Sequence, residues 1–255
     1  MYLRLSILPK ILYGGLVFII IFYPGWARFI LQLTGVEAAG CDSWEVAGID
    51  FVDMPYGIFT KKRNFSTTQD NSADYWYVHD NRVHGYFSES GMQFNGSYNR
   101  IENNEIYKVS DINNTPYGCQ LLNLVGNNNI VRGNILSRKG STAQCLGILL
   151  EWDLADANLI ENNTLTDVGW EGKGGLVIAG GDNNIIRYNT IKTDTSNWLY
   201  IYPENDEGTW PCNEDIEAPS IVPANQPMAN DYEYFYPHNC QSTNNQVYDN
   251  LYVEP

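Results

Sequence analysis

Basic side chains are scarce in this sequence. Its 255 residues include 15 Lys and Arg against 30 Asp and Glu, a formal net charge of −15 at pH 7. Nucleic-acid binding needs basic patches that neutralise phosphates, so the composition argues against nucleic acid as a partner. The same deficit disfavours an anionic glycan unless the fold builds a local basic site.

Histidines and closely spaced cysteines, the usual zinc ligands, are also few. The three histidines, His79, His84 and His238, are scattered, and no Cys-x-x-Cys pair occurs, so the sequence contains no zinc motif. We therefore expect no cofactor and no metal centre, with calcium the one ion left open. Helical repeats are also disfavoured, because apolar residues do not recur every three and four residues in the repeated segments of this sequence.

The sequence has instead a repeat. Residues 158–165 read Asn-x-Ile-x-x-Asn-x-Leu, and related copies recur along the chain. The second Asn of each copy, or its equivalent, is Asn81, Asn104, Asn134, Asn163, Asn189 or Asn250. The steps of 23, 30, 29, 26 and 61 residues indicate a solenoid, with the last step long enough for one coil and a large loop.

The apolar positions of each copy lie five residues apart, on either side of the second Asn. We interpret each copy as two short β-strands around a bend, because Asn tolerates left-handed backbone and bonds to turn backbone. With about 4.8 Å between stacked coils, each amide can donate to one neighbour and accept from the other. A disordered Asn-rich chain is disfavoured, because Ile, Val and Leu keep register with the Asn.

We call the second Asn of each copy the ladder Asn. A column of residues two positions before each ladder Asn supports this register. Its members are His79, Glu102, Arg132, Glu161, Arg187 and Tyr248. From Glu102 to Arg187 the charges alternate in sign, as expected for ion pairs between stacked coils on an exposed face. We interpret this column as structural and not as a catalytic row.

The Asn-x-Ile-x-x-Asn-x-Ile copies resemble the right-handed parallel β-helix repeat of the pectin-lyase-like superfamily, over about residues 44–255. The resemblance implies an all-β parallel solenoid of about six to seven coils. It implies no particular activity, because that fold includes lyases, hydrolases, epimerases, adhesins and proteins without chemistry.

Residues 1–40 read as a targeting segment ahead of a solenoid domain at residues 41–255. Residues 11–23 are almost continuously apolar and follow Arg4 and Lys10, as in signal peptides and membrane anchors. A cleaved signal peptide, a retained anchor across residues 11–33 and a lipoprotein signal with a lipid on Cys41 all stay open. Each of these three versions places the solenoid outside the cytoplasm, at the cell surface, in the periplasm or secreted. The remaining alternative is that the apolar segment forms a buried helix that caps the first coil.

The five cysteines fit an oxidising compartment. Cys119 and Cys145 hold similar places in successive coils, so we expect a disulfide between them. Cys212 and Cys240 can close the long Pro- and Tyr-rich loop at residues 203–244, which interrupts the repeat.

Candidate binding residues follow from the resemblance, because substrates of β-helix enzymes lie along an outer sheet face. The residues predicted for that face are Gln93, Asn123, Glu151, Trp152 and Asp182. Glu151 and Asp153, beside an aromatic ring, form a carboxylate pair of the kind used in glycoside hydrolysis. The Asn-Thr-Asp and Asp-Asp motifs of polygalacturonases and the Asp-Pro-His motif of alginate epimerases are missing.

Lys108 and Arg138 are the candidates for lyase chemistry. Each stands four residues after a ladder Asn, in successive coils, so we expect them to be neighbours. Proton abstraction from a uronate needs a base and neutralisation of the carboxylate. The pair resembles the Lys and Arg arrangement of β-helix polysaccharide lyases in kind only, since no family motif surrounds it.

The sequence leaves two hypotheses for function. The first is an extracytoplasmic, membrane-anchored solenoid that binds a polysaccharide or a cell-surface partner along its outer sheet face without catalysis. The second is an enzyme that acts on a polysaccharide at the same face, with a lyase favoured over a glycoside hydrolase. The acidity, the anchor segment and the missing motifs favour the first.

Overall fold

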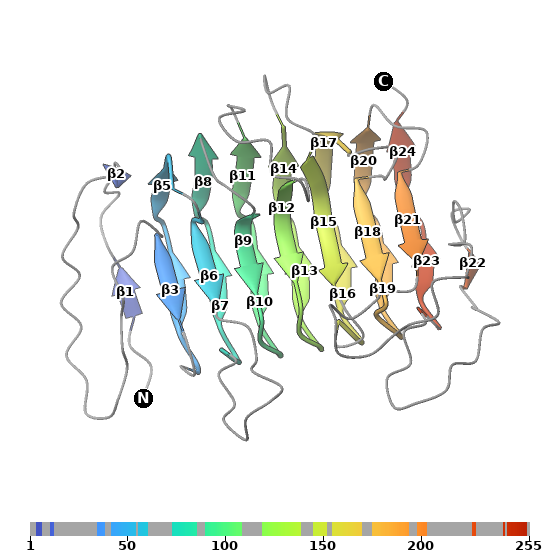
Figure 1. Ribbon diagram of the computed structural model, residues 1–255, viewed down its shortest axis with the longest axis horizontal. Helices are drawn as coiled ribbons and strands as arrows, with labels where there is room; N and C mark the ends of the chain where they lie inside the picture. The colour runs from blue at the N-terminus through green and yellow to red at the C-terminus, as the bar shows by residue number, and fades with distance from the viewer. Residues whose placement is uncertain are drawn as a thin grey trace, which may run out of the picture.

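The computed structural model describes most of the solenoid. The residues described are 4–6, 11–12, 35–38, 42–54, 56–60, 73–85, 90–108, 119–138, 145–151, 155–169, 175–193, 198–202, 226–227, 242 and 244–253. All secondary structure within them is β, and the strands stack in parallel along one axis (Figure 1). The predicted all-β solenoid is confirmed. No helix long and apolar enough to cross a membrane occurs in this part of the chain.

The strands form three sheets, here named A, B and C. Sheet A contains β1 (Arg4–Ser6), β4 (Glu45–Ala47), β7 (Tyr77–His79), β10 (Arg100–Glu102), β13 (Ile130–Arg132), β16 (Leu159–Glu161), β19 (Ile185–Arg187), β23 (Gln246–Tyr248) and the antiparallel β22 (Gln226–Pro227). Sheet B contains β2 (Ile11–Leu12), β5 (Asp50–Val52), β8 (Arg82–Gly85), β11 (Glu105–Lys108), β14 (Ile135–Ser137), β17 (Thr164–Val168), β20 (Thr190–Thr193) and β24 (Leu251–Val253). Sheet C contains β3 (Val36–Ala38), β6 (Ile58–Thr60), β9 (Ser90–Phe94), β12 (Cys119–Leu124), β15 (Cys145–Glu151), β18 (Leu176–Ala179) and β21 (Leu199–Tyr202).

Each coil runs from a strand of sheet A through sheet B to sheet C. Four coils have every strand side chain described, namely β4–β6, β7–β9, β13–β15 and β16–β18. The described side chains thus cover about four complete coils of the six to seven expected from the repeat. Strand pairing continues the same order through β10–β12 and β19–β21.

The core is built from columns of like residues. The central residue of each sheet A strand from β7 onward is Val or Ile, and all of these are buried, namely Val78, Ile101, Val131, Ile160, Ile186 and Val247. Register pairs each of them with its counterpart one coil away. Because a β-strand alternates sides, the residues flanking this column point outward, which fixes what each outer face displays.

The bend between sheets A and B needs left-handed backbone. The residue before each ladder Asn has a positive φ, for example 54° at Asn103, 55° at Asn162 and 68° at Gly133. This conformation is unfavourable for most side chains, and Asn, Asp and Gly adopt it most readily. The chain therefore turns sharply at the same point in every coil.

The six predicted ladder Asn residues form one file at this bend, buried from Asn81 to Asn189 and half-buried at Asn250. At Asn134, Oδ1 accepts the backbone N–H (2.9 Å) and Nδ2 (3.0 Å) of Asn104. Its own Nδ2 donates to Asn163 Oδ1 (3.0 Å) and to the Ile101 carbonyl (2.9 Å). The same pattern links Asn81 to Asn104 and continues to Asn189 and Asn250. From Asn81 to Asn189, each amide is thereby satisfied by the coils on both sides, as a buried polar group requires.

A second Asn file, which we did not predict, lies at the bend between sheets C and A. Its members are Asn99, Asn129, Asn158, Asn184 and Asn245. Each Oδ1 accepts a backbone N–H of the preceding coil, as in Asn129 to Asn158 (2.8 Å). The Nδ2 atoms of Asn99, Asn129 and Asn184 have no partner among the described residues. This file therefore holds the bend with fewer bonds than the first.

We expect Asn134→Ala to lower the free energy of unfolding by about 3 kcal/mol, because two donors of Asn104 and the Ile101 carbonyl lose a buried partner. Urea denaturation followed by circular dichroism measures this. The matched control is Asn128→Gly at an exposed bend position with φ of 55°, which glycine adopts freely and which should change stability by less than about 1 kcal/mol. Equal losses in the two variants would contradict the proposed role of the file.

Candidate functional site

The outer face of sheet C, predicted to carry the binding residues, divides into two parts. Phe59, Gln93, Asn123, Leu149 and Val177 occupy one column, paired in register from β6 to β18. Phe59 and Gln93 are half-buried, whereas Leu149 and Val177 are buried. The column is therefore half-buried at Phe59 and Gln93, buried from Asn123 onward, and apolar from Leu149 onward.

Three of the predicted residues meet at this change. Asn123 Nδ2 donates to Glu151 Oε2 at 2.7 Å, and Gln93 lies beside Asn123 on the neighbouring strand. We call Gln93, Asn123 and Glu151 the polar patch. Asn123 is only 3 % exposed, and its Oδ1 has no hydrogen-bond partner among the described residues.

An aromatic pair borders the polar patch. The Phe59 ring lies 4.8 Å from the Tyr56 ring, centroid to centroid, and tilts by 35°. Phe59 pairs in register with Gln93, so an aromatic surface continues directly into a row of amides. Phe59 was not predicted as a binding residue, although its place in an alternating strand marks it as outward-facing.

The apolar part of the face was not predicted. Leu146, Leu149, Val177 and Ala179 form a buried cluster separate from the main core. The sequence holds a signal for it, because β15 and β18 read as continuous apolar runs without alternation, as in strands covered on both faces.

The remaining residues predicted for this face lie elsewhere or outside the described residues. Trp152 and Asp153 are outside them, so the carboxylate pair with Glu151 stays a prediction. Asp182 lies in the bend after β18. Its backbone N–H donates to Asp156 Oδ1 at 2.6 Å, and its carbonyl accepts the N–H of Ala157 at 2.8 Å. Asp182 thus takes part in the backbone bonding of a bend.

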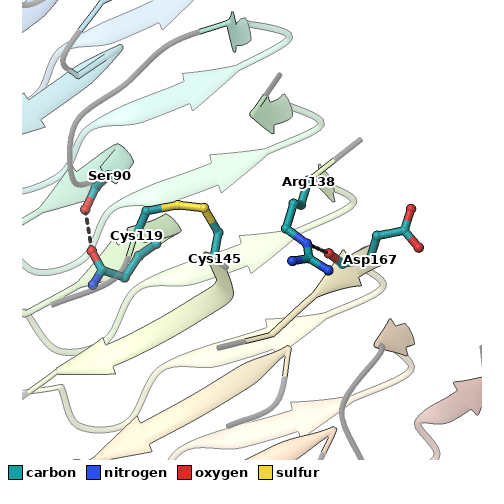
Figure 2. Close-up of a disulfide and its surroundings, with 6 residues drawn as sticks. Ser90, Cys119, Arg138, Cys145 and Asp167 are labelled. Carbon is teal, nitrogen blue, oxygen red and sulfur yellow. Dashed lines mark hydrogen bonds between the residues drawn. A yellow bond between two sulfur atoms is a disulfide. The ribbon is translucent and has the colours of Figure 1, made fainter. Parts of the chain in front are cut away.

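The lyase candidates lie at the ends of sheet B strands. Lys108 ends β11, and its side chain is outside the described residues. Arg138 follows β14, and its Nε donates to the Asp167 carbonyl (Figure 2). Glu151 is six residues along β15 from Cys145, or about 20 Å. Because Arg138 lies at the Cys145 end (Figure 2), it cannot share one small site with Glu151.

The predicted disulfide between Cys119 and Cys145 is confirmed. These residues pair in register on β12 and β15, with their Cα atoms 4.5 Å apart, and the bond links two successive coils (Figure 2). Both cysteines are buried. Cys41, Cys212 and Cys240 lie outside the described residues, so the loop disulfide stays a prediction.

Sheet A carries the predicted charge column on its outer face. Arg132 contacts Glu102 at 2.7 Å and Glu161 at 3.4 Å, and Arg187 contacts Glu161 at 2.8 Å. Arg100 adds a further contact to Glu102 at 3.0 Å. The alternating signs thus become a continuous chain of ion pairs along the solenoid axis.

The carboxylates of this chain are the better buried partners. Burial alone would raise the pKa of the Glu102 carboxyl, but hydrogen bonds from Arg132 and Arg100 outweigh it and hold the pKa below its ordinary value. The hydrogen bond to Glu102 in turn raises the pKa of Arg132. Burial, followed by the nearby Glu102 charge, raises the pKa of the Tyr77 hydroxyl.

Neither metals nor relatives identify a function. Within the described residues, no group of three or more His, Cys, Asp and Glu side chains is arranged to hold a metal ion. No protein-family model matches the chain, and comparison with curated proteins finds no match. Functional inference therefore depends on the geometry of the outer faces.

We expect Glu102→Gln to flatten the dependence of stability on acid pH. A carboxyl whose pKa is lower when folded adds stability above its unfolded pKa, near 4.5, and this stability is lost as pH falls through the folded pKa. Urea unfolding at about pH 7, 5 and 3 should show a less stable variant at pH 7 and a smaller loss between pH 5 and 3 than in the native protein.

The matched control is Glu105→Gln, whose half-exposed carboxylate pairs with Arg82 on sheet B. Its stability curve should run nearly parallel to that of the native protein, since an exposed pair contributes little. If the stability curve of Glu102→Gln also ran parallel to that of the native protein, the buried ion pair would have no part in the dependence of stability on acid pH.

Proposed function

We propose that this protein is an extracytoplasmic β-solenoid that binds a neutral glycan on the outer face of sheet C without catalysing a reaction on it. The observation that carries this proposal is the row that leads from the Phe59 ring through Gln93 and Asn123 to the Glu151 carboxylate. It combines a half-buried aromatic ring, the Gln93 amide and the Glu151 carboxylate on one edge of the face, and the buried Asn123 amide holds that carboxylate in place.

The chemistry of this row matches that of sugars. A pyranose ring has an apolar C–H face that packs on an aromatic ring and a rim of hydroxyls that both donate and accept hydrogen bonds. Gln93 supplies a donor and an acceptor, and Glu151 supplies acceptors. Because neighbouring strands lie about 4.8 Å apart, the row offers contacts at Phe59, Gln93 and Glu151 to an extended polymer along the axis.

The charge of the row favours a neutral glycan over an acidic one. Its only ionised group is the Glu151 carboxylate, and the whole chain has a net charge of −15. A polyuronate would meet repulsion on this face with no cation of the polar patch to offset it.

The location and lineage form part of the same proposal. A disulfide between buried Cys119 and Cys145 is typical of proteins outside the reducing cytoplasm. Attachment through residues 11–33 or through a lipid on Cys41 would hold the solenoid at a membrane surface. The file of ladder Asn residues at the bend between sheets A and B supports a right-handed β-helix of the pectin-lyase-like kind.

Polysaccharide lyase activity is the alternative function. Lys108 and Arg138 hold corresponding places at the ends of β11 and β14, and the Arg138 guanidinium is fixed by the Asp167 carbonyl. An enzyme of this class would release unsaturated sugar ends from a uronate polymer, and Arg138→Ala would abolish that release. The absence of any such product from alginate, pectin or glycosaminoglycans would leave the binding function.

Affinity electrophoresis through gels that contain single neutral polysaccharides tests the binding proposal. We expect retardation in at least one of cellulose derivatives, mannan, xylan or galactan, and a loss of about tenfold in affinity in both Phe59→Ala and Gln93→Ala. The matched control is Gln246→Ala, an exposed glutamine on sheet A, which should bind as the native protein does. Absence of retardation in every gel would refute the proposal.

A further inference from the structure

The outer face of sheet A differs in kind from that of sheet C. Two columns run along it from β10 to β19. One contains the charged residues Glu102, Arg132, Glu161 and Arg187. The other begins with Arg100 and continues as a half-buried apolar row of Ile130, Leu159 and Ile185.

The charges on this face lie at two depths. The side chains of Arg100, Arg132 and Arg187 are 48, 42 and 32 % exposed, whereas those of Glu102 and Glu161 are each 8 % exposed. Three guanidinium groups therefore cover two carboxylates. A molecule that approaches the face meets positive charge first, although the chain as a whole is strongly acidic.

The arginines also keep hydrogen-bond donors for a ligand. Arg132 donates through one N–H of each terminal nitrogen, to Glu161 and to Glu102. A guanidinium carries five N–H groups, so Nε–H and two others of Arg132 remain without a partner among the described residues. The buried carboxylates meanwhile fix the guanidinium planes, which lowers the entropy lost when a ligand binds.

We propose that Arg100, Arg132 and Arg187, with the adjoining apolar row, form an arginine strip that binds an acidic polysaccharide lying parallel to the solenoid axis. Carboxylates along one edge of the polymer pair with the guanidiniums. The apolar C–H faces of its sugar rings lie on Ile130, Leu159 and Ile185.

The spacing on the strip favours a carboxylated sugar chain. Arg100 and Arg132 lie on successive coils, and Arg132 and Arg187 lie two coils apart, so the cations are about 4.8 and 9.6 Å apart along the axis. One coil is comparable to the length of one pyranose in an extended chain. A nucleic acid would bring a denser charge and would be repelled by the rest of the acidic surface.

This site is independent of the glycan site proposed on sheet C. It lies on another sheet, uses cations and takes an acidic polymer, whereas the polar patch carries a carboxylate and takes a neutral one. Substitutions on one face should therefore leave binding on the other unchanged.

Fluorescence anisotropy with labelled polygalacturonate oligomers in low-salt buffer tests the strip in the full-length protein. We expect binding that weakens steeply with added salt, and Arg132→Gln combined with Arg187→Gln should reduce affinity at least about tenfold. The matched control is Arg82→Gln combined with Lys192→Gln on sheet B, which removes the same charge and should retain native affinity. Equal loss in both double variants would mean diffuse attraction and would overturn the proposal.

A second pair of variants leaves every arginine and buried carboxylate in place. Leu159→Glu puts a like charge in the apolar row and should weaken polygalacturonate binding about tenfold, whereas Thr164→Glu on the outer face of sheet B should not. Native affinity in Leu159→Glu, or tighter binding of heparin, polyphosphate or single-stranded DNA than of polygalacturonate, would overturn the assignment. Unchanged binding in Phe59→Ala and Gln93→Ala would confirm that the two faces act separately.

Discussion

The hydrogen bonds within the file of ladder Asn residues, Asn134 among them, are the constraint on which the rest of this structure depends. Each amide bonds to the coils before and after it, so a coil can be added in one register only. A slip of one residue would bury the outer face and expose the core column. The left-handed residue at each bend is unfavourable alone, and the satisfied amide beside it offsets that cost.

This register also determines which side chains meet on the outside. Residues in one outward column are forced within one strand spacing of each other, and like charges there would repel. Sheet A resolves this by alternating Glu and Arg, with the shorter carboxylates below and the longer guanidiniums above. Sheet C resolves it with neutral amides and then with Leu149 and Val177. The same geometry thus yields two faces of different chemistry.

The repeat allowed the fold, the first Asn file, the charge column and the Cys119–Cys145 bond to be predicted, because each depends on residues at fixed offsets from one Asn. The second Asn file was not predicted, although Asn99 and Asn129 stand at the same offset in their copies of the repeat. The burial of Leu149 could not be derived from periodicity, because periodicity says which side faces out and not whether that side is covered. Side-chain depth, which makes the sheet A face basic, likewise depends on packing and not on offsets.

The proposed arginine strip would give this acidic protein selectivity among charged polymers. At physiological ionic strength, charges separated by more than about 8 Å are largely screened, so distant acidic residues do not cancel a strip in which three guanidiniums outnumber the two carboxylates they contact. The surrounding acidic surface still disfavours a polyanion at every other place on the molecule. A charged polymer would therefore be confined to one face and, because the cations lie in a line along the stacked coils, to one direction. Under the function proposed above, neutral glycans would experience no such restriction and would bind the row of sheet C.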